Sequence, residues 1–504
     1  MKIVFRVDAS IWIGGGHVMR CLALAQALKP AIESVKFACL PQNGDLIQLI
    51  QSRGFQVCVL NTPAWIITPE NDTDYAAWLQ RSQEDDVADF IKVVGHADLV
   101  VTDHYAIDAA WQKAIRQAFR CKIVVIDDLV RNHEADLIVD QTLGRSRTAY
   151  DGASRVLAGS HYALLAGTFA RNHEIALDSA ARSGRPKVLV YFGAIDAHNM
   201  CLRVLEVLTP IIDAAFTVVL GKAALHYDVI RNWALERDDV EHLEFVNDMA
   251  ELILKHDFAV GAPGTSSWER ACLGLPSVVI PIADNQAENG RKLVASDAAI
   301  SVDKGCLDAE LVSAVQKLMK NRVDYAASNL AICDGRGAVR VAIEIEIESL
   351  LDQNDTASVG LERATEADID YVHRLQSAPT TRKYALNSEI PSWPEHKVWM
   401  TSKLKVTTDY FYIIRKGQGN TPCGVLRLDR RANGGYTVSI YIDPDYYSQG
   451  IGRSALAIID RVFADCDLHA VVMEANVASQ KLFLKAGYER MAKEYFIRKR
   501  KIGS

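Results

Sequence analysis

The sequence predicts an α/β protein with two doubly wound lobes, followed by a smaller α+β domain. Three observations support this fold class. The length of 504 residues corresponds to about three domains of ordinary size. Residues 1–340 alternate apolar runs with helical stretches, whereas the remainder shows a different pattern. The chain is 49% hydrophobic and 24% charged, and this composition excludes disordered, collagen-like and coiled-coil proteins.

Two sets of short Val-, Ile- and Leu-rich runs define the two lobes. Continuous apolar runs between helices are typical of parallel strands that are buried on both faces. The polar segment 178–186 separates the sets, so we expect Rossmann-like lobes at 1–178 and 179–348 with a cleft between them. The expected strands of the first lobe are Lys2–Val7, Val35–Cys39, Gln56–Leu60, Leu99–Thr102 and Lys122–Ile126. Those of the second lobe are Lys187–Phe192, Phe216–Leu220, Phe258–Val260 and Ser277–Pro281.

A further change of pattern occurs near residue 350. The segment 352–358 is polar and has no apolar period, as is typical of a linker. The runs Tyr410–Arg415, Gly424–Leu428 and Tyr436–Ile442 then follow as strands of an antiparallel sheet. We therefore expect a linker at 349–359 and an α+β domain at 360–504.

Charge and cysteine content limit the partners and the compartment. The net charge of −7 does not suggest the basic face that duplex DNA requires, so we expect no nucleic-acid partner. Arg6 and Asp8 interrupt the N-terminal apolar run, and no apolar stretch is long enough to cross a bilayer. We therefore expect a cytoplasmic protein with no membrane partner. The ten cysteines form no CxxC pair and are interpreted as free thiols.

A glycine-rich turn follows the first expected strand. Gly14, Gly15 and Gly16 allow a ligand to approach the backbone closely, and His17 begins the next helix. A histidine at this place can act as a general base near neutral pH. The alternative interpretation is a turn with an incidental histidine, because glycine clusters after strands are common.

A second turn, in the second lobe, predicts a nucleotide-sugar site without a P-loop lysine. Gly264, Thr265 and Ser266 can offer N–H and hydroxyl donors to phosphate oxygens, and Glu269 can accept hydrogen bonds from a ribose diol. The segment 283–286 follows the next strand and lies at the same edge of the sheet. A capped helix with a solvated glutamate is the alternative interpretation.

Residues 1–340 resemble the UDP-sugar hydrolases of pseudaminic acid biosynthesis, which are relatives of GT-B glycosyltransferases. The resemblance implies a GT-B-like pair of lobes that hydrolyses UDP-2,4-diacetamido-2,4,6-trideoxy-beta-L-altropyranose. It implies that His17 activates water and that a UDP-linked amino sugar contacts Gly15, Gly16, Arg20, Tyr105, Gly264, Thr265, Ser266, Glu269, Asn285 and Gln286. The segments that carry the resemblance are Asp8–Cys21, Thr102–Tyr105, Asp127–Leu129, Arg131 with His133, Asp140-Gln141, Ala262–Arg270 and Asn285-Gln286.

The expected reaction needs no metal. Water attacks the anomeric carbon opposite UDP, so the configuration inverts and the anomeric C–O bond breaks. The adjacent carboxylates of Asp127 and Asp128 are the best argument for a metal site, but we interpret them as a contact with sugar or loop at the end of a strand. One departure from the family pattern is Ala194, which stands where a second glycine is usual. The diphosphate contact at that loop is therefore not carried over.

The last domain resembles the GNAT acetyltransferases over its whole length. Its turn after the strand ending at Ile442 is rich in glycine and leads into an apolar helix. The resemblance implies acetyl-CoA as co-substrate, bound by Gln449, Gly450, Ile451, Gly452, Arg453 and Asn476. Phe483 stands where many members carry a tyrosine general acid, so Tyr488, Tyr495 or water would have to replace it. The implied acceptor is the 4-amino group of a UDP-sugar, one step before hydrolysis.

Three alternatives remain open at this point. A GT-B glycosyltransferase would pass the sugar to an acceptor instead of water. The same chemistry could serve another nonulosonic acid, such as legionaminic acid. A nucleotide-sugar sensor with a vestigial acetyltransferase domain is the non-catalytic alternative.

Overall fold

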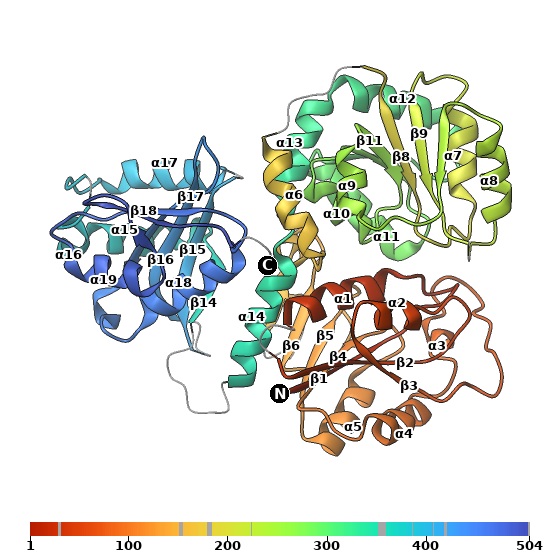
Figure 1. The fold of residues 1–504 in the computed structure, drawn as a ribbon, viewed down its shortest axis with the longest axis horizontal. Coiled ribbons are helices and arrows are strands. Elements are labelled where there is room, and N and C mark those ends of the chain that lie inside the picture. Colours follow the sequence, from red (N-terminus) through yellow and green to blue (C-terminus); the bar gives the residue numbers. More distant parts are fainter. Residues whose placement is uncertain are drawn as a thin grey trace. The chain divides into compact units, whose positions relative to one another are not determined.

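The computed structural model describes residues 1–28, 32–150, 155–178, 184–222, 224–350, 359–385, 387–406, 408–417 and 421–501, with the backbone only for 284, 285 and 347–350. The chain divides into two compact units, Met1–Ile345 and Glu346–Ser504. The predicted fold class is confirmed: the first unit contains two parallel sheets and the second a mixed sheet. Figure 1 shows both lobes of the first unit, each with helices around a central sheet.

The first lobe is a seven-stranded sheet in the order β3-β2-β1-β4-β5-β6-β7, and every pairing is parallel. The chain winds outward in both directions from β1 and β4, so the carboxyl ends of these two strands form the switch point where ligands bind in such sheets. The strands are β1 Lys2–Val7, β2 Ser34–Cys39, β3 Gln56–Val59, β4 Leu99–Asp103, β5 Lys122–Ile126, β6 Leu137–Asp140 and β7 Val156–Ala158. The helices are α1 Gly16–Leu28, α2 Ile47–Ser52, α3 Tyr75–Trp78, α4 Gln83–Val94, α5 Ala109–Phe119 and α6 Gly167–Leu177.

The second lobe has six parallel strands in the order β10-β9-β8-β11-β12-β13, with its switch point between β8 and β11. The strands are β8 Lys187–Tyr191, β9 Ala215–Val219, β10 Val240–Leu243, β11 Phe258–Gly261, β12 Ser277–Val279 and β13 Ala299–Ser301. The helices are α7 Met200–Leu208, α8 Tyr227–Leu235, α9 Met249–Leu254, α10 Ser266–Cys272, α11 Asp284–Ala295, α12 Leu307–Lys320, α13 Arg322–Ile332 and α14 Gly337–Leu350.

Two helices pack against the sheet of the other lobe: α6 belongs to the first lobe by sequence but packs on the second sheet, and α14 does the reverse. Phe169 and Ala176 of α6 lie in one buried cluster with residues of the second sheet. Val341 and Ile345 of α14 lie in the core of the first sheet. The lobes therefore exchange one helix each, which a boundary drawn along the sequence cannot represent. The predicted boundaries at 178, 348 and 359 stay predictions.

The second unit has a seven-stranded sheet in the order β14-β15-β16-β17-β18-β20-β19. The first three pairings are antiparallel, and for β15 with β16 and β16 with β17 this was predicted. Strand β17 then pairs with β18 in parallel over only two residue pairs. The strands are β14 Val359–Arg363, β15 Tyr410–Lys416, β16 Thr421–Arg430, β17 Tyr436–Ile442, β18 Leu468–Val471, β19 Glu489–Arg490 and β20 Tyr495–Arg498. The helices are α15 Ile369–Ser377, α16 Pro379–Arg382, α17 Trp393–Leu404, α18 Ile451–Val462 and α19 Val477–Lys485.

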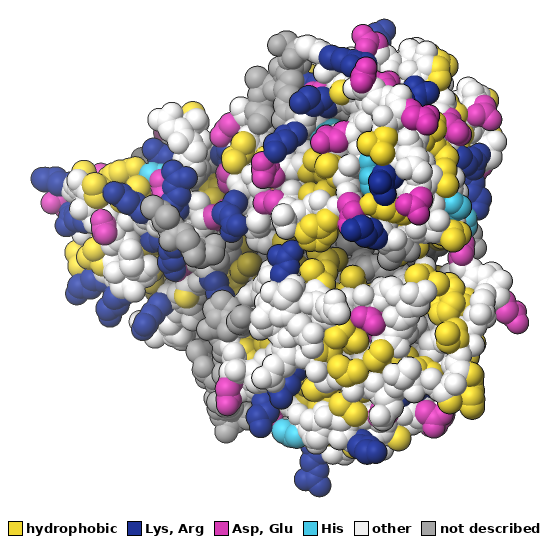
Figure 2. Space-filling view, turned by 45° about the vertical axis from the view of Figure 1, so that its right-hand side comes forward, with side chains coloured by type: hydrophobic (Ala, Val, Ile, Leu, Met, Phe, Trp, Pro, Cys, Tyr) yellow, Lys and Arg dark blue, Asp and Glu magenta, His cyan; other side chains and the backbone are white. Residues whose placement is uncertain are grey.

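The surface carries both signs of charge. Figure 2 shows basic and acidic side chains interspersed over the face drawn, with small groups of hydrophobic side chains between them. Among the residues described, no helix is both long and apolar enough to span a bilayer.

Candidate active sites

His17 lies at the switch point of the first sheet, where α1 begins after β1 and meets the end of β4. Its Nδ1 is 2.6 Å from Asp103 Oδ1, the last residue of β4. A carboxylate accepts the Nδ1–H proton, which leaves Nε2 as the basic nitrogen of the ring. Nε2 has no hydrogen-bond partner among the residues that the structure describes. The histidine is therefore held in the tautomer that a general base requires.

Arg20, one turn further along α1, fixes the carboxylate that holds His17. Its Nε and Nη2 donate to Asp103 Oδ2 and Oδ1, both at 2.6 Å, in a bidentate pair that is fully buried. Burial by itself would raise the pKa of Asp103, but Arg20 and then His17 outweigh it and hold that pKa well below its ordinary value. Asp103 is thus ionised throughout the physiological range.

Tyr105 and Asp128 complete the polar ring around Arg20. The Tyr105 hydroxyl donates to Asp128 Oδ1 at 2.6 Å, and Arg20 Nη1 donates to Asp128 Oδ2 at 3.1 Å. Tyr105 also packs edge-on against the His17 ring at a centroid distance of 4.7 Å. Trp78 of α3 stacks on Tyr105 at a centroid distance of 5.6 Å and lies edge-on to the His17 ring at 6.4 Å. The imidazole is therefore fixed by aromatic packing as well as by its hydrogen bond.

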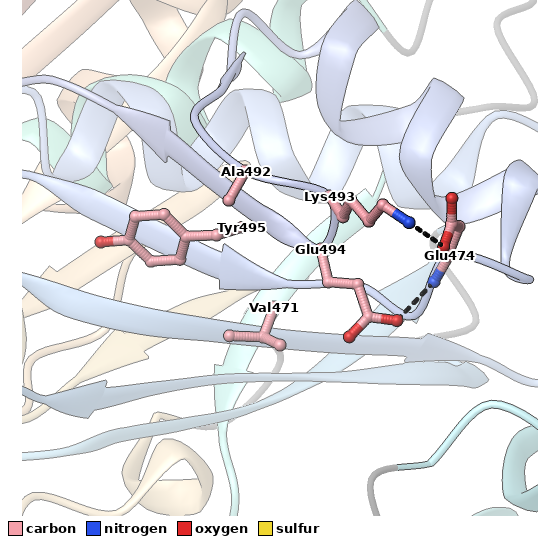
Figure 3. Close-up of a pocket in the computed structure, with 6 residues that line it drawn as sticks. All are labelled: Val471, Glu474, Ala492, Lys493, Glu494 and Tyr495. Atoms are coloured by element: carbon pink, nitrogen blue, oxygen red, sulfur yellow. Dashed lines mark hydrogen bonds and ion pairs between the residues drawn. The ribbon is translucent and has the colours of Figure 1, made fainter.

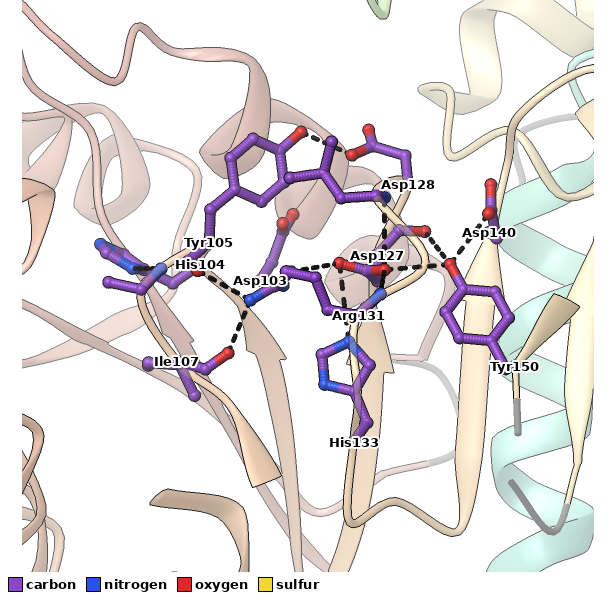
Figure 4. Close-up of polar contacts among 12 residues, drawn as sticks. Asp103, His104, Tyr105, Ile107, Asp127, Asp128, Arg131, His133, Asp140 and Tyr150 are labelled. Carbon is purple, nitrogen blue, oxygen red and sulfur yellow. Dashed lines mark hydrogen bonds and ion pairs between the residues drawn. The ribbon is translucent and has the colours of Figure 1, made fainter. Parts of the chain in front are cut away.

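The strand ends next to this ring are tied to their own loops. Asp127 accepts from Arg131 Nε at 2.7 Å and from the Tyr150 hydroxyl at 3.0 Å, and the same hydroxyl reaches Asp140 at 2.9 Å. His133 lies against Asp127 from below (Figure 4). Asp127 and Asp128 thus both have protein partners. Among the described residues, no group of three or more His, Cys, Asp and Glu side chains is arranged to hold a metal.

The glycine-rich turn of the first lobe comes close to the second lobe. Gly14 has a φ of +73°, a conformation that favours glycine. A Cβ added to Gly16 would lie 3.7 Å from Thr265 Oγ1, and one added to Gly15 would lie 3.0 Å from Leu46 Cδ1. The residue that precedes His17 therefore adjoins the turn between β11 and α10.

That second turn depends on a glycine at its start. A Cβ on Gly261 would lie 2.3 Å from the Tyr191 carbonyl oxygen, so only glycine lets β11 and β8 approach here. Gly264 is open, since the nearest atom to an added Cβ is Gln286 Nε2 at 4.0 Å. Gln286 itself accepts the Ile282 N–H through Oε1 at 3.0 Å, which leaves its amide N–H₂ directed elsewhere. The side chain of Asn285, predicted at this site, lies outside the described residues.

Glu269 and Arg270 differ sharply although they are adjacent. Arg270 is buried and donates to Ser266 Oγ at 2.9 Å, to Ser267 Oγ at 3.0 Å and to the Ala262 carbonyl at 2.9 Å, so it ties the turn together. Glu269 is half-buried and has no hydrogen-bond partner among the described residues. Desolvation raises the pKa of Glu269 to about 7, against the smaller opposing effect of Arg270. An unpaired carboxyl group of this kind is suited to accept hydrogen bonds from a ligand.

The two central helices of the second lobe begin differently. After β8, Asp196 fills the start of α7 with its own carboxylate, which accepts from Met200 N at 2.9 Å and Cys201 N at 2.8 Å. After β11, no side chain caps α10, whose N-cap residue is Thr265. An anion would therefore meet a closed helix start at α7 and an open one at α10. The closed start of α7 agrees with the sequence analysis, in which the loop at Ala194 lacks its usual second glycine and is not expected to contact the diphosphate.

In the second unit, β17 and β18 diverge after Thr437 and His469, which form their last pair. The turn that follows β17 leads into α18 through Gly450, which has a φ of +78° and leaves the helix without a side-chain cap. Gln449 is exposed and accepts from Lys416 Nζ at 2.6 Å. Two further predicted residues point differently: Arg453 is exposed, whereas the Ile451 side chain is buried. Ile451 can therefore offer a ligand its backbone only.

Gly452, Asn476 and Phe483 lie where α18 and α19 meet the sheet. A Cβ on Gly452 would lie 3.1 Å from Leu482 Cδ2, so this glycine permits close helix packing. Asn476 caps α19 by accepting the Ser479 N–H at 3.1 Å, which leaves its amide donors for a ligand. Phe483 is buried against Tyr488, whose hydroxyl is also buried and has no partner in the described part of the chain.

Sequence reasoning interpreted Asp128 only as a strand-end contact with sugar or loop, gave Asp103 no role beyond its place in a segment that carries the resemblance, and did not consider His469. Both aspartates follow apolar runs that end at the same edge of a parallel sheet. The rule that ligands bind at carboxyl strand ends beside the switch point would have singled them out. His469 lies in a short strand with no turn signal before it, so no local pattern marks it.

Comparisons with known proteins support the division into two kinds of domain. Residues 189–335 match the family model of the glycosyltransferase family 28 C-terminal domain, and residues 358–489 match that of the acetyltransferase (GNAT) domain. An uncharacterised protein of Methanocaldococcus jannaschii is 23% identical over 98% of this chain and 98% of its own length.

Two characterised relatives are similar to part of the chain. A spore coat polysaccharide biosynthesis protein of Bacillus subtilis is 25% identical over 68% of this chain and 96% of its own length. The UDP-2,4-diacetamido-2,4,6-trideoxy-beta-L-altropyranose hydrolase of Campylobacter jejuni is 27% identical over 40% of this chain and 64% of its own length. The crystal structure of the glycotransferase of kitacinnamycin covers 69% of this chain and 98% of its own, with a TM-score of 0.50 at 15% identity, which shows the fold alone. The chain therefore has two Rossmann-like parallel sheets with a GT-B-like fold, in which residues 189–335 are similar to the glycosyltransferase family 28 C-terminal domain, followed by an α+β unit that is similar to the GNAT acetyltransferase domain.

Proposed function

We propose that the first unit hydrolyses a UDP-linked diacetamido-trideoxy sugar of the altropyranose type, and that the second unit N-acetylates its 4-amino precursor with acetyl-CoA. The observation that carries the first half is the His17–Asp103 pair, with the ring held in one tautomer and Nε2 unpartnered. The similarity to the Campylobacter jejuni hydrolase supports the choice of substrate. The domain limits 1–178, 179–348 and 360–504 belong to this proposal.

In the proposed hydrolysis, His17 Nε2 takes a proton from water while Asp103 stabilises the imidazolium that forms. The water oxygen bonds to the anomeric carbon, and the bond from that carbon to the phosphate oxygen breaks. Its electron pair leaves with UDP, and the configuration at the anomeric carbon inverts. Arg20 keeps Asp103 ionised and in place, so it acts on the reaction through the carboxylate.

The second lobe supplies nucleotide recognition in this proposal. Glu269 accepts hydrogen bonds from the ribose hydroxyls, and Thr265 and Ser266 donate to phosphate oxygens together with the backbone at Gly264. Gln286 and Asn285 contact the nucleotide sugar from the next loop, and Gly15, Gly16 and Tyr105 border it from the first lobe. The proximity of Gly16 to Thr265 supports a single site built by both turns.

The test replaces His17 with asparagine, which keeps a polar side chain of similar size. His17→Asn is expected to bind UDP-sugar with unchanged Kd and to release UDP at least about 10²-fold more slowly, the usual contribution of a general base. His96→Asn is the matched control, because that histidine is exposed and its ion pair with Asp98 lies at the surface of the same lobe. UDP release by His17→Asn at the wild-type rate would contradict the assignment.

A GT-B glycosyltransferase is the second candidate, because the family that matches residues 189–335 is named for sugar transfer. The two differ in what attacks the anomeric carbon. Incubation of UDP-sugar without any acceptor yields free reducing sugar if the enzyme is a hydrolase and none if it requires an acceptor. Turnover of the corresponding UDP-sugars of legionaminic acid biosynthesis would show whether the protein serves that pathway instead. Tight binding of UDP-sugar without turnover would favour a sensor.

The residues of the second unit fit acetyl-CoA. The divergence of β17 from β18 opens a slot in the sheet, and the uncapped start of α18 after Gly450 suits a pyrophosphate. Gln449, Gly450, Ile451 (by its backbone), Gly452, Arg453 and Asn476 would hold the co-substrate. The two activities then follow one another on one chain. Feeding the UDP-4-amino sugar with and without acetyl-CoA, and following UDP by mass spectrometry, tests whether acetylation must precede hydrolysis.

A further inference from the structure

The diphosphate of the proposed substrate carries negative charge that the two turns of the first unit do not neutralise. Gly264, Thr265 and Ser266 offer backbone N–H groups and hydroxyls, which are neutral donors. Arg20 and Arg270 are buried, and their Nη atoms are bound within the protein. When the anomeric C–O bond breaks with its electron pair on UDP, a further negative charge collects on the β-phosphate. A cation that reaches this phosphate would lower the barrier to reaction.

Arg145, in the loop after β6, is anchored to the first lobe. Its Nε donates to Asp140 Oδ2 at 2.6 Å, and its Nη2 donates to the Asp128 carbonyl oxygen at 3.1 Å. The carboxylate of Asp128 belongs to the polar ring beside His17, so Arg145 adjoins that ring. Arg145 Nη1 has no hydrogen-bond partner in the described part of the chain and is not sealed from solvent. It is therefore available to a ligand.

The guanidinium group of Arg145 also reaches the second lobe. Its Nη2 lies 3.5 Å from Glu288 Oε2 of α11, which is long for an ion pair between arginine and a carboxylate. Glu288 has a closer partner in Lys292 at 2.8 Å, so it can release Arg145 without being left unpaired. Gln286 lies two residues before Glu288, and its Nε2 borders the open space at Gly264. Arg145 thus lies where the first lobe meets the helix beside the phosphate turn.

The place of the sugar decides which phosphate Arg145 would meet. The sugar is bonded to the β-phosphate, and its anomeric carbon must lie beside His17 for the proposed attack by water. Gly16, which precedes His17, adjoins the phosphate turn, because a Cβ added to it would lie 3.7 Å from Thr265 Oγ1. The β-phosphate is therefore the phosphate nearer to the first lobe, to which Arg145 belongs.

We propose that Arg145 is a further catalytic residue of the hydrolase, which exchanges Glu288 for the β-phosphate of the bound UDP-sugar and neutralises the charge that collects there as UDP leaves. The inference rests on the proposed hydrolysis and deepens it. Arg145 gives up no proton in this step, and the electron pair of the broken bond stays on the β-phosphate oxygen. A planar guanidinium group can keep Asp140 on Nε while its Nη atoms bind phosphate.

The neighbouring charges keep Arg145 cationic. Burial alone would lower its pKa, but the carboxylates of Asp140 and Glu288 outweigh burial and raise the pKa of Arg145 above its ordinary value. The phosphate would replace Glu288 as an anionic partner, so the guanidinium group remains paired on both sides throughout the step.

A cavity of about 330 Å³ in the second unit provides a contrast, because the polar groups that line it bind one another or their neighbours. Glu494 Oε1 accepts the Glu474 N–H at 2.7 Å, and Glu474 pairs with Lys493 at 3.6 Å (Figure 3). The hydroxyl of Tyr495, which also lines the cavity, is 2.6 Å from His469 Nδ1. The protein itself thus uses these groups, whereas Arg145 has a nitrogen to offer.

The binding test uses the full chain with UDP and UMP, of which only UDP has a β-phosphate. Arg145→Gln is expected to weaken UDP binding by about tenfold or more and to leave Kd for UMP within about twofold of wild type. Arg185→Gln is the matched control, because Arg185 is exposed and pairs with Asp213 at the amino ends of β8 and β9, the opposite edge of the sheet. Isothermal titration calorimetry measures both constants. Equal weakening of UDP and UMP would indicate a damaged loop and overturn the proposal.

A second variant should have an effect of opposite sign. Glu288→Gln removes the carboxylate that competes for Arg145, so UDP should bind about threefold more tightly. In the Arg145→Gln background the same substitution should have a smaller effect, because no arginine is left to be released. An equal gain in both backgrounds would mean that Glu288 acts on the nucleotide without Arg145, and the exchange of partners would be overturned.

Turnover separates this proposal from the proposed function. With the UDP-linked diacetamido sugar, Arg145→Gln should lower kcat for UDP release by about 10²-fold. Arg145→Lys should recover only part of that loss, because one ammonium group cannot hold Asp140 and phosphate as a guanidinium group does. If wild type hydrolyses the sugar and Arg145→Gln matches it in turnover and in UDP binding, the role of Arg145 is overturned while hydrolysis stands. If wild type binds UDP without hydrolysing the sugar, the proposed function fails, and the comparison of UDP with UMP still decides whether Arg145 contacts the β-phosphate.

Discussion

Each lobe of the first unit has a glycine-rich turn between a strand and a helix, but the charged side chains at the two turns are paired differently. In the first, His17 and Arg20 share the carboxylate of Asp103, and Asp128 completes the set, so each charge has a partner. In the second, Arg270 binds its own turn, and Glu269 is left without a partner in the described part of the chain. A closed network holds a reactive group in a fixed geometry, whereas an open group has binding capacity for a ligand. The difference assigns chemistry to the first turn and recognition to the second.

The largest expected effect comes from breaking the closed network. Asp103→Asn removes the charge that stabilises imidazolium and permits the wrong tautomer of His17, so kcat for UDP release should fall by about 10³-fold or more. Kd for UDP should stay within about twofold, because Asp103 makes none of the proposed nucleotide contacts. Asp128→Asn is the matched control: it touches Arg20 and Tyr105 but not His17, so a much smaller loss is expected. Equal losses in the two variants would contradict the special role of Asp103.

Two glycine-to-alanine substitutions test whether the turn between β11 and α10 has free space for a ligand. Gly261→Ala places a Cβ against the Tyr191 carbonyl oxygen, and the clash should lower the free energy of unfolding by about 3 kcal/mol. Gly264→Ala meets no close neighbour and should change that free energy by less than about 0.5 kcal/mol. Urea denaturation measures both. Gly264→Ala should instead weaken UDP binding, because its methyl group would occupy the space assigned to phosphate.

A smaller, pH-dependent effect is expected from Glu269. Its pKa is raised from 4.5 to about 7 in the folded protein. The contribution of protonated Glu269 to the free energy of unfolding is therefore fully present below pH 4.5 and is lost as the pH rises through 7. The reason is that the unfolded chain releases this proton at a lower pH than the folded protein does. After allowance for partial exposure, the loss in free energy of unfolding is about 2 kcal/mol.

Glu269→Gln cannot lose that proton, so its stability should exceed that of wild type increasingly between pH 5 and 8, by the same amount of about 2 kcal/mol at the upper end. Chemical denaturation at several pH values measures this difference. The variant should also bind UDP about tenfold more weakly, because a charged acceptor for the ribose is gone. A difference in stability that is independent of pH would show that Glu269 already has a partner in the free protein.

Most of the architecture could be predicted because the central strands are mostly apolar. Lys2–Val7, Lys122–Ile126 and Tyr436–Ile442 were expected with the limits that the structure has. Short edge strands such as β7 and β13, with three residues each, carry too little pattern to be recognised. Strand β18 ends at Val471, and Asn476 then caps the helix that follows.

The candidate sites could be predicted only in part. Local sequence marks turns, so Gly14–His17 and Gly264–Glu269 were found as strand-to-helix turns with polar side chains. The partners of those side chains come from other strands: Asp103 lies 86 residues from His17 in the sequence. The same holds for the pair of His469 and Tyr495, which only the order of β17, β18 and β20 brings together. Pairing across a sheet is a property of topology, which no local pattern encodes.

The measurement that addresses the central proposal most directly is turnover of the UDP-linked diacetamido sugar in H₂¹⁸O. If a water activated by His17 attacks the anomeric carbon, the heavy oxygen enters the free sugar and the released UDP contains none. Heavy oxygen in the UDP would mean that water attacks phosphorus instead, and the mechanism built on His17 and Asp103 would be contradicted.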